Sequence, residues 1–151
     1  MNGWSKFLPP ALFALAGMLA GCASTEPSTT RQAGIQAAKQ QVVLQISDDN
    51  VKTWQTAFNV VNNLSNTYGK GNVQIEVIAF GDGIHALTFD SKAAGRIPGA
   101  LERGASVVAC ENSMTRFKLS RQDMAPDISY VRTGVQRIIE RQQQGWTVIR
   151  P

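Results

Sequence analysis

The pattern of apolar and polar residues along the chain predicts strands that alternate with helices. Residues 41–46, 73–80 and 105–110 are short, mostly apolar runs with polar or glycine-rich sequence around them, as in buried strands. Shorter runs at 128–131 and 146–149 predict two further strands. Strands that alternate with helices favour an α/β sandwich around a mainly parallel sheet.

The helical segments are defined by apolar spacing and by the residues that end them. Trp54, Phe58 and Val61 recur every three or four residues, as on the buried face of a helix, and Gly69 supplies its stop. Residues 93–103 carry a weaker helical pattern because glycines and a proline interrupt it. The helix that ends at Gly69 is therefore predicted in more detail than the helix within residues 93–103.

The last predicted helix covers residues 133–144 and ends before a glycine. We expect Val135, Ile138 and Ile139 to form its buried face.

The first 38 residues follow a different pattern. Residues 1–21 combine a weakly basic start, an apolar stretch shorter than the roughly 20 residues of a membrane-spanning helix, and small residues before Cys22. This architecture is typical of a secretion signal, and Leu19-Ala20-Gly21-Cys22 resembles the lipobox of bacterial lipoproteins. We expect cleavage before Cys22, followed by its lipidation; the alternative is an ordinary signal peptide that leaves a free thiol.

The segment after the leader resembles a linker. Residues 22–38 are rich in Ser, Thr, Ala, Gln and Pro without apolar periodicity, so we expect a lipidated Cys22 followed by a flexible tether. Ala23, where an Asp would favour the inner membrane, suggests a periplasmic protein on the outer membrane. Residues 39–151 then form one domain, which is long enough for a single core.

The charges of the chain exclude some classes of partner. The net charge of +4 is spread over scattered arginines, with no basic run and no alternation of basic and aromatic residues. Nucleic-acid binding is therefore not expected. The chain has one histidine, His85, so a histidine metal cluster is excluded, and neither a metal nor a cofactor is expected. Asp48, Asp49 and Asn50 are explained better as helix caps than as cation ligands.

Candidate chemistry gathers at three loops that follow predicted strands. In parallel sheets, ligands bind beyond the carboxyl ends of the strands, and here these ends lead into residues 47–50, 81–85 and 110–114. Cys110 is the main candidate, because a thiolate near a helix N-terminus is a nucleophile. The alternative is an inert cysteine at the end of a buried strand. Adjacent Glu111 opposes ionisation of the thiol.

The other candidates in these loops are weaker. His85 is a possible base or proton donor to Cys110. Asn112 and Ser113 are possible hydrogen-bond donors to a sulfur ligand, or simple helix caps. The remaining candidates belong to one glycine-rich turn, whose backbone amides and carboxylate are candidates to orient a ligand, although the sequence is not a phosphate loop. They are Gly81, Asp82 and Gly83.

Several motifs together resemble the DsrE/DsrF-like (YchN-like) family. They are Val77-Ile78-Ala79-Phe80-Gly81-Asp82-Gly83, Ala109-Cys110-Glu111-Asn112-Ser113-Met114, Gly134-Val135 and Gln142-Gln143-Gln144-Gly145-Trp146. The resemblance covers roughly residues 41–151. It implies a three-layer α/β/α sandwich on a five-stranded, mainly parallel sheet, and assembly as a homo-oligomer, a trimer or a hexamer.

The resemblance also implies a chemistry. Sulfur-relay members carry sulfur as a cysteine persulfide, and Cys110 is the matching position in this chain. We therefore expect a periplasmic, lipid-anchored protein that binds or transfers sulfur, with a donor or acceptor protein as partner. Two alternatives stay open: a non-catalytic oligomeric binding or scaffold module with a structural Cys110, and a redox sensor that forms intermolecular disulfides.

Overall fold

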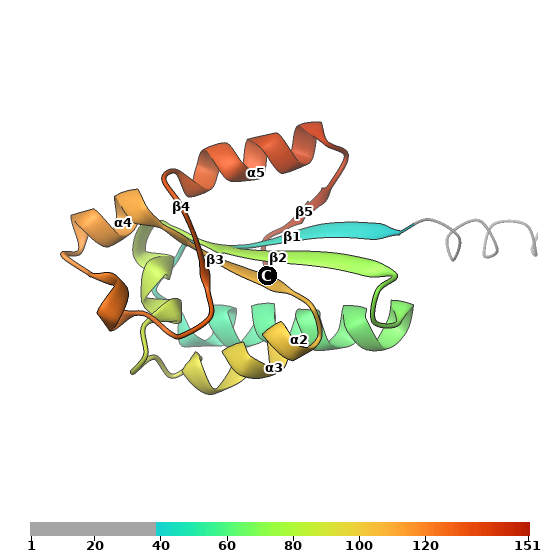
Figure 1. The fold of residues 1–151 in the computed structure, drawn as a ribbon, viewed down its shortest axis with the longest axis horizontal. Coiled ribbons are helices and arrows are strands. Elements are labelled where there is room, and N and C mark those ends of the chain that lie inside the picture. The colour runs from blue at the N-terminus through green and yellow to red at the C-terminus, as the bar shows by residue number, and fades with distance from the viewer. Residues whose placement is uncertain (1–38) are drawn as a thin grey trace, which may run out of the picture.

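The computed structural model describes residues 39–151, which fold into a five-stranded sheet between two layers of helices (Figure 1). All neighbouring strands are parallel, in the order β4-β3-β2-β1-β5. The predicted α/β sandwich is therefore confirmed. The strands are β1 (Gln40–Ile46), β2 (Val73–Ala79), β3 (Ser106–Cys110), β4 (Ser129–Val131) and β5 (Thr147–Ile149).

The helices are divided unequally between the two faces of the sheet. Helices α2 (Val51–Tyr68) and α3 (Ile97–Glu102) lie on one face, whereas α5 (Gly134–Gln143) lies on the other (Figure 1). A short helix, α4 (Glu111–Arg116), follows β3 directly. Three 3₁₀ helices complete the fold: η1 (Gly81–Leu87), η2 (Ala94–Arg96) and η3 (Arg121–Asp123).

Local sequence explains where α2 begins and ends. The Asn50 side chain accepts a hydrogen bond from the Lys52 N–H at 2.9 Å, which caps the first turn. At the other end Gly69 has a φ of 85°, in the left-handed region, and its N–H donates to the Ser65 carbonyl. Trp54 is buried and donates its indole N–H to the Asp48 carbonyl at 2.8 Å, which fixes the helix to the loop before it.

The core is split by the sheet into two parts. The larger part lies between the sheet and α2, where Leu44, Phe58 and Val77 are fully buried. The smaller part lies under α5 and contains Val43, Ile78, Val108, Ile138 and Trp146. β2 is buried over nearly its whole length because it is the central strand of a sheet covered on both faces.

Helix α5 presents a narrower apolar face than predicted. Of its three expected core residues Ile138 is buried, whereas Val135 and Ile139 are 47% and 50% exposed. The prediction was wrong for these two because α5 turns Gly134, Ile138 and its arginines toward the sheet. An apolar pair is thus left on its outer surface.

Two loop segments also differ from the expectation. Gly81-Asp82-Gly83 was predicted as a tight turn, but it forms the first part of the 3₁₀ helix η1. The interrupted pattern of residues 93–103 becomes η2 followed by α3, with Pro98 in the first turn of α3, where a missing N–H is tolerated.

The predicted signal peptide, Cys22 and the tether lie outside the described residues. Within residues 39–151, no helix is long and apolar enough to cross a membrane.

Candidate functional site

Cys110 lies where β3 ends and α4 begins, at the carboxyl edge of the sheet. It is the last residue of β3 and the N-cap residue of α4. Its side chain points to the same face as Val108, which is the face that α5 covers. The cysteine is free, as expected within the folded domain.

The sulfur is held at the N-terminus of α5. The N–H of Gly134, the first residue of that helix, donates to Cys110 Sγ at 3.3 Å. In the other direction, the thiol donates to the Arg132 carbonyl at 3.7 Å. Because an α-helix has a partial positive charge at its N-terminus, this position favours a thiolate.

The pKa of the Cys110 thiol lies below its ordinary value. Burial is the largest single influence and raises this pKa, but four hydrogen bonds together outweigh it. They come from the Ser113 side chain and from the backbone N–H groups of Gly134, Ser113 and Asn112. Each donor favours the charged form of the sulfur.

Ser113 connects the Cys110 loop to the loop after β2. The N–H of Gly81 donates to Ser113 Oγ at 2.8 Å, and Ser113 is 7% exposed. Because that bond uses the oxygen as an acceptor, the hydroxyl hydrogen remains available for the sulfur. The serine thus has a defined role at the thiol, beyond that of a helix cap.

The loop after β1, which begins at Ser47, lies directly against the backbone of the loop after β2. A Cβ on Gly83 would lie 2.4 Å from the Ile46 carbonyl oxygen and 2.7 Å from Ser47 N, so a side chain does not fit there. The ends of β1, β2 and β3 thus converge, as the strand polarity predicted. The role of Gly83 is this close packing, since its φ is not in the left-handed region.

Glu111 forms an ion pair with an arginine at the surface. Arg121 donates to Glu111 Oε1 at 2.9 Å, and its guanidinium lies 4.3 Å from the Tyr130 ring centre. The expected opposition of Glu111 to a thiolate is therefore reduced. The Asn112 side chain donates to Thr133 at 3.2 Å, while its backbone N–H donates to the Arg132 carbonyl at 3.2 Å and also contributes to the lowered pKa of the thiol.

His85 and Asp82 lie on η1, next to this site, but make no bond to the thiol. The His85 ring packs edge-on against Phe117, with 4.6 Å between the ring centres. Asp82 is exposed in the first turn of η1. Within the described part of the chain, no hydrogen bond or ion pair joins either residue to Cys110.

The structure adds two residues that the sequence did not single out for the site, Gly134 and Arg132. Their contacts with Cys110 span more than twenty positions of the chain, so no local spacing reveals them. Gly134 is also closely surrounded, because a Cβ there would lie 3.0 Å from Phe80 Cβ and 3.3 Å from Cys110 Cβ. The one available sequence feature is a glycine placed at the start of a predicted helix.

Cys110 is only 4% exposed. The sulfur is therefore buried among the groups that hydrogen-bond to it. In residues 39–151, no group of three or more His, Cys, Asp or Glu side chains is placed to hold a metal ion.

Comparisons with known proteins give the family and the fold. The model of the DsrE/DsrF-like family matches residues 40–151. No match was found among curated proteins.

Solved structures share the fold. A protein of unknown function from Methanobacterium thermoautotrophicum, MTH1491, is 29% identical with a TM-score of 0.69, over 74% of this chain and 99% of that one. YchN from E. coli is 11% identical with a TM-score of 0.59, over 73% and 97%. BT1422 from Bacteroides thetaiotaomicron, a conserved protein of unknown function, is 17% identical with a TM-score of 0.54, over 80% and 98%. Since these chains are matched almost completely, the domain is a folding unit of its own.

Proposed function

This chain belongs to the DsrE/DsrF-like family, and from that premise we propose that its folded domain binds and transfers sulfur as a persulfide on Cys110. The observation that supports this most is the hydrogen bond from the Gly134 N–H at the start of α5 to Cys110 Sγ. The same donors that favour a thiolate would also favour the terminal sulfur anion of a persulfide.

The chemistry needs no redox co-reactant. The Cys110 thiolate attacks the outer sulfur of a sulfane donor such as thiosulfate, the S–S bond of the donor breaks, and sulfite leaves with the bonding electron pair. The product is the Cys110 persulfide. An acceptor thiolate then attacks the outer sulfur of the persulfide and releases Cys110 as a thiolate. Ser113 and Gly134 hold the negative charge before and after each step.

The test uses the soluble domain, residues 39–151, in which Cys110 is the only cysteine. After incubation with thiosulfate, intact mass should show the addition of one sulfur atom, mapped to Cys110 and removed by a reductant. Cys110→Ala should fold and take up no sulfur. If the wild-type domain takes up no sulfur from thiosulfate or sulfide-derived polysulfides, the relay function is wrong.

A second candidate function is an oligomeric binding or scaffold module with a structural Cys110. The low exposure of Cys110 favours it. Under this alternative, the thiol reacts with an alkylating reagent only after denaturation, and Cys110→Ala mainly lowers the free energy of unfolding.

We also propose that the protein is exported and lipid-anchored through Cys22. The support is the architecture of residues 1–21 and Leu19-Ala20-Gly21-Cys22. Labelled palmitate should be incorporated by the full chain and not by Cys22→Ala, with the wild-type protein in the outer-membrane fraction. Full incorporation by Cys22→Ala would exclude this anchor.

A further inference from the structure

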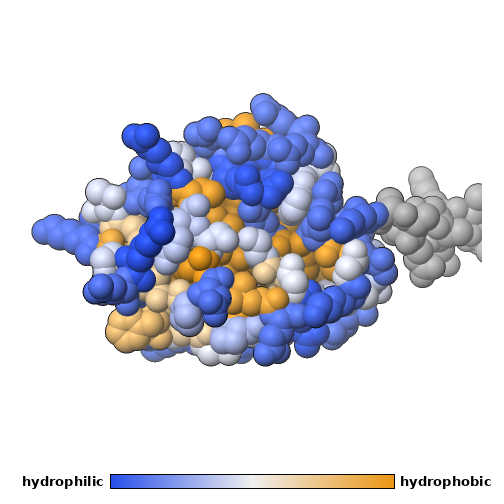
Figure 2. Space-filling model, in the orientation of Figure 1, coloured by the Kyte–Doolittle hydropathy of each residue, from blue (hydrophilic) through white to orange (hydrophobic). Residues whose placement is uncertain are grey.

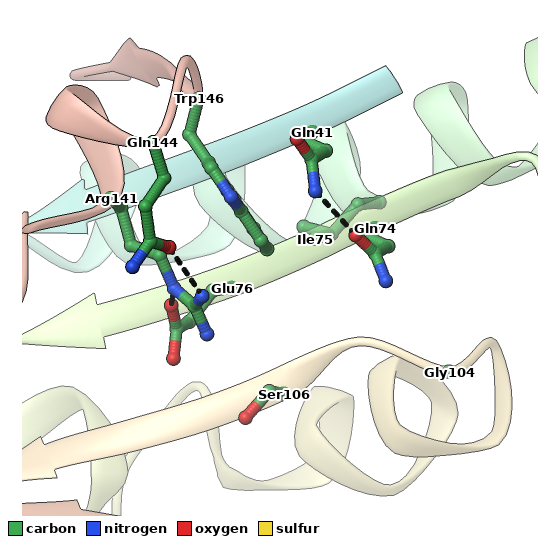
Figure 3. Close-up of a pocket in the computed structure, with 9 residues that line it drawn as sticks. All are labelled: Gln41, Gln74, Ile75, Glu76, Gly104, Ser106, Arg141, Gln144 and Trp146. Atoms are coloured by element: carbon green, nitrogen blue, oxygen red, sulfur yellow. Dashed lines mark hydrogen bonds and ion pairs between the residues drawn. The ribbon is translucent and has the colours of Figure 1, made fainter. Parts of the chain in front are cut away.

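A hollow lies on the α5 face of the sheet, at the end opposite the thiol. It has a volume of about 350 Å³ and is lined from β1, β2, β3 and the C-terminal end of α5 (Figure 3). Ser106, on its floor, lies four residues before Cys110 on the same face of β3, so the hollow is about 13 Å away along the strand. We propose that this hollow binds a small hydroxylated carboxylic acid.

The hollow surrounds a buried charge cluster. Glu76, in the middle of the central strand, is 2% exposed, and both of its oxygens are already occupied. Arg137 donates to Oε1 through two nitrogens, and Arg141 donates to Oε2. Glu140 lies 4.0 Å from Arg137, but its side chain is 43% exposed and its charge is screened by solvent. Two arginines thus surround one buried carboxylate, and Arg141 is the one that lines the hollow.

Donor groups outnumber acceptors on the walls of the hollow. The Nε2 amides of Gln74 and Gln144, the indole N–H of Trp146 and Nη2 of Arg141 have no hydrogen-bond partner within residues 39–151. The side-chain oxygen of Gln41 is the matching free acceptor, and the Ser106 hydroxyl can act in either role. A ligand that satisfies these groups must be rich in acceptors, and a carboxylate provides the most.

The positions of the side chains indicate that the ligand also carries hydroxyl groups. In Figure 3, Arg141 and Gln144 stand on one side of Trp146, and the paired Gln41 and Gln74 stand on the other, with Ser106 on the neighbouring strand. Arg141 and Gln144 therefore present donors on one side of Trp146, and the amides of Gln41 and Gln74 present both a donor and an acceptor on the other. Hydroxyls that both donate and accept are suited to the amide side, and the volume is at the lower end of the range for small-molecule sites.

The polar lining also argues against burial of this hollow by an apolar partner. Gln41, Gln74 and Ser106 occupy strand positions whose neighbours on the same face, Val43 and Val108, are core residues. Burying these amides and the hydroxyl without new hydrogen bonds would cost free energy. A hydrophilic ligand satisfies them.

The test is a titration of the ¹⁵N-labelled domain, residues 39–151, with gluconate followed by NMR. The Trp146 indole, Gln74 amide and Ser106 backbone signals should shift together. Gluconamide, which is uncharged and otherwise matched, should bind about tenfold more weakly because it lacks a charge-assisted hydrogen bond. No shift in the hollow, or equal affinity for both compounds, overturns the proposal.

Variants separate this site from the fold and from the thiol. Gln74→Leu should weaken gluconate binding in a domain that still folds, whereas Gln122→Leu, at an exposed position on η3, should leave binding normal. Cys110→Ala should also bind normally, so failure of the sulfur function and failure of this proposal are distinguishable. Unchanged binding by folded Gln74→Leu overturns the proposal.

Discussion

At the scale of single residues, Cys110 combines two properties that sequence reasoning treated as alternatives. It is buried, which raises the pKa of a thiol, and it is surrounded by donors, which lower that pKa. The donors outweigh burial, so the native thiol ionises at a lower pH than an unfolded one. Between these two pKa values the unfolded state holds more protons, and stability rises with pH in that window. The stabilisation that comes from the Cys110 ionisation is complete above the unfolded pKa and is lost as the pH falls through the native pKa.

Ser113 should control this ionisation. Ser113→Ala removes the side-chain donor that lowers the pKa most, so the pH midpoint of Cys110 alkylation by iodoacetamide should move upward. Persulfide formation at neutral pH should slow in parallel. Thr115→Ala is the matched control, because it removes a hydroxyl of the same helix that bonds only to the Glu111 carbonyl. An unchanged midpoint in Ser113→Ala would remove the serine from the site.

Gly83 should be required for the convergence of the three loops. In Gly83→Ala the new Cβ meets backbone atoms of Ile46 and Ser47, which cannot rotate away, so we expect a loss of about 3 kcal/mol in the free energy of unfolding. Gly95→Ala is the control, since nothing lies within 4 Å of its Cβ position and its φ is ordinary. Denaturant unfolding of both variants tests this, and equal stability would contradict it.

At the scale of elements, α5 has a double role. Its N-terminus holds the thiol, and its middle is fixed to the sheet through Arg137, Arg141 and Glu76. Those contacts turn Val135 and Ile139, one helical turn apart, to the surface. Figure 2 shows a small apolar area at the top of the molecule, where α5 lies. The pair supports the expectation of a homo-oligomer, which remains a prediction.

The predicted oligomer should depend on this pair. Val135→Gln with Ile139→Gln should lower the mass of the domain in light scattering to that of a monomer, because the apolar area that drives association is removed. Gln136→Ala with Gln143→Ala changes exposed polar positions of the same helix and should leave the mass unchanged. A wild-type domain that is monomeric at every concentration would exclude this interface.

How well the sequence predicted each element depends on how far apart along the chain the interacting residues lie. Caps such as Asn50 and Gly69 act within one or two turns, so the bounds of α2 were accessible from local pattern. The side of α5 that faces the sheet is decided by Glu76, 61 positions before Arg137, and the apolar pattern alone gave the wrong face for Val135 and Ile139. Cys110 was found from residue type, whereas Gly134 required the fold.

At the scale of the whole molecule, strand polarity separates the two ends of the protein. The described chain enters at the amino end of β1, and Cys110 lies at the carboxyl end of β3. Since the strands are parallel, these two places lie at opposite ends of the strands (Figure 1). The separation is about 23 Å for a seven-residue strand. Any anchor in residues 1–38 is therefore joined to the domain at the edge opposite the thiol.

This separation can be measured with cysteines placed at each edge of the lipidated protein, in a Cys110→Ala background. Asp82→Cys marks the thiol edge and Lys70→Cys the entry edge, and both positions are exposed. On vesicles, polyethylene glycol maleimide should label Asp82→Cys as fast as it does in the soluble domain, and Lys70→Cys more slowly, because the bilayer hinders a bulky reagent at the near edge. Equal slowing of both would show that the domain has no preferred orientation, and partners of Cys110 would then include membrane proteins.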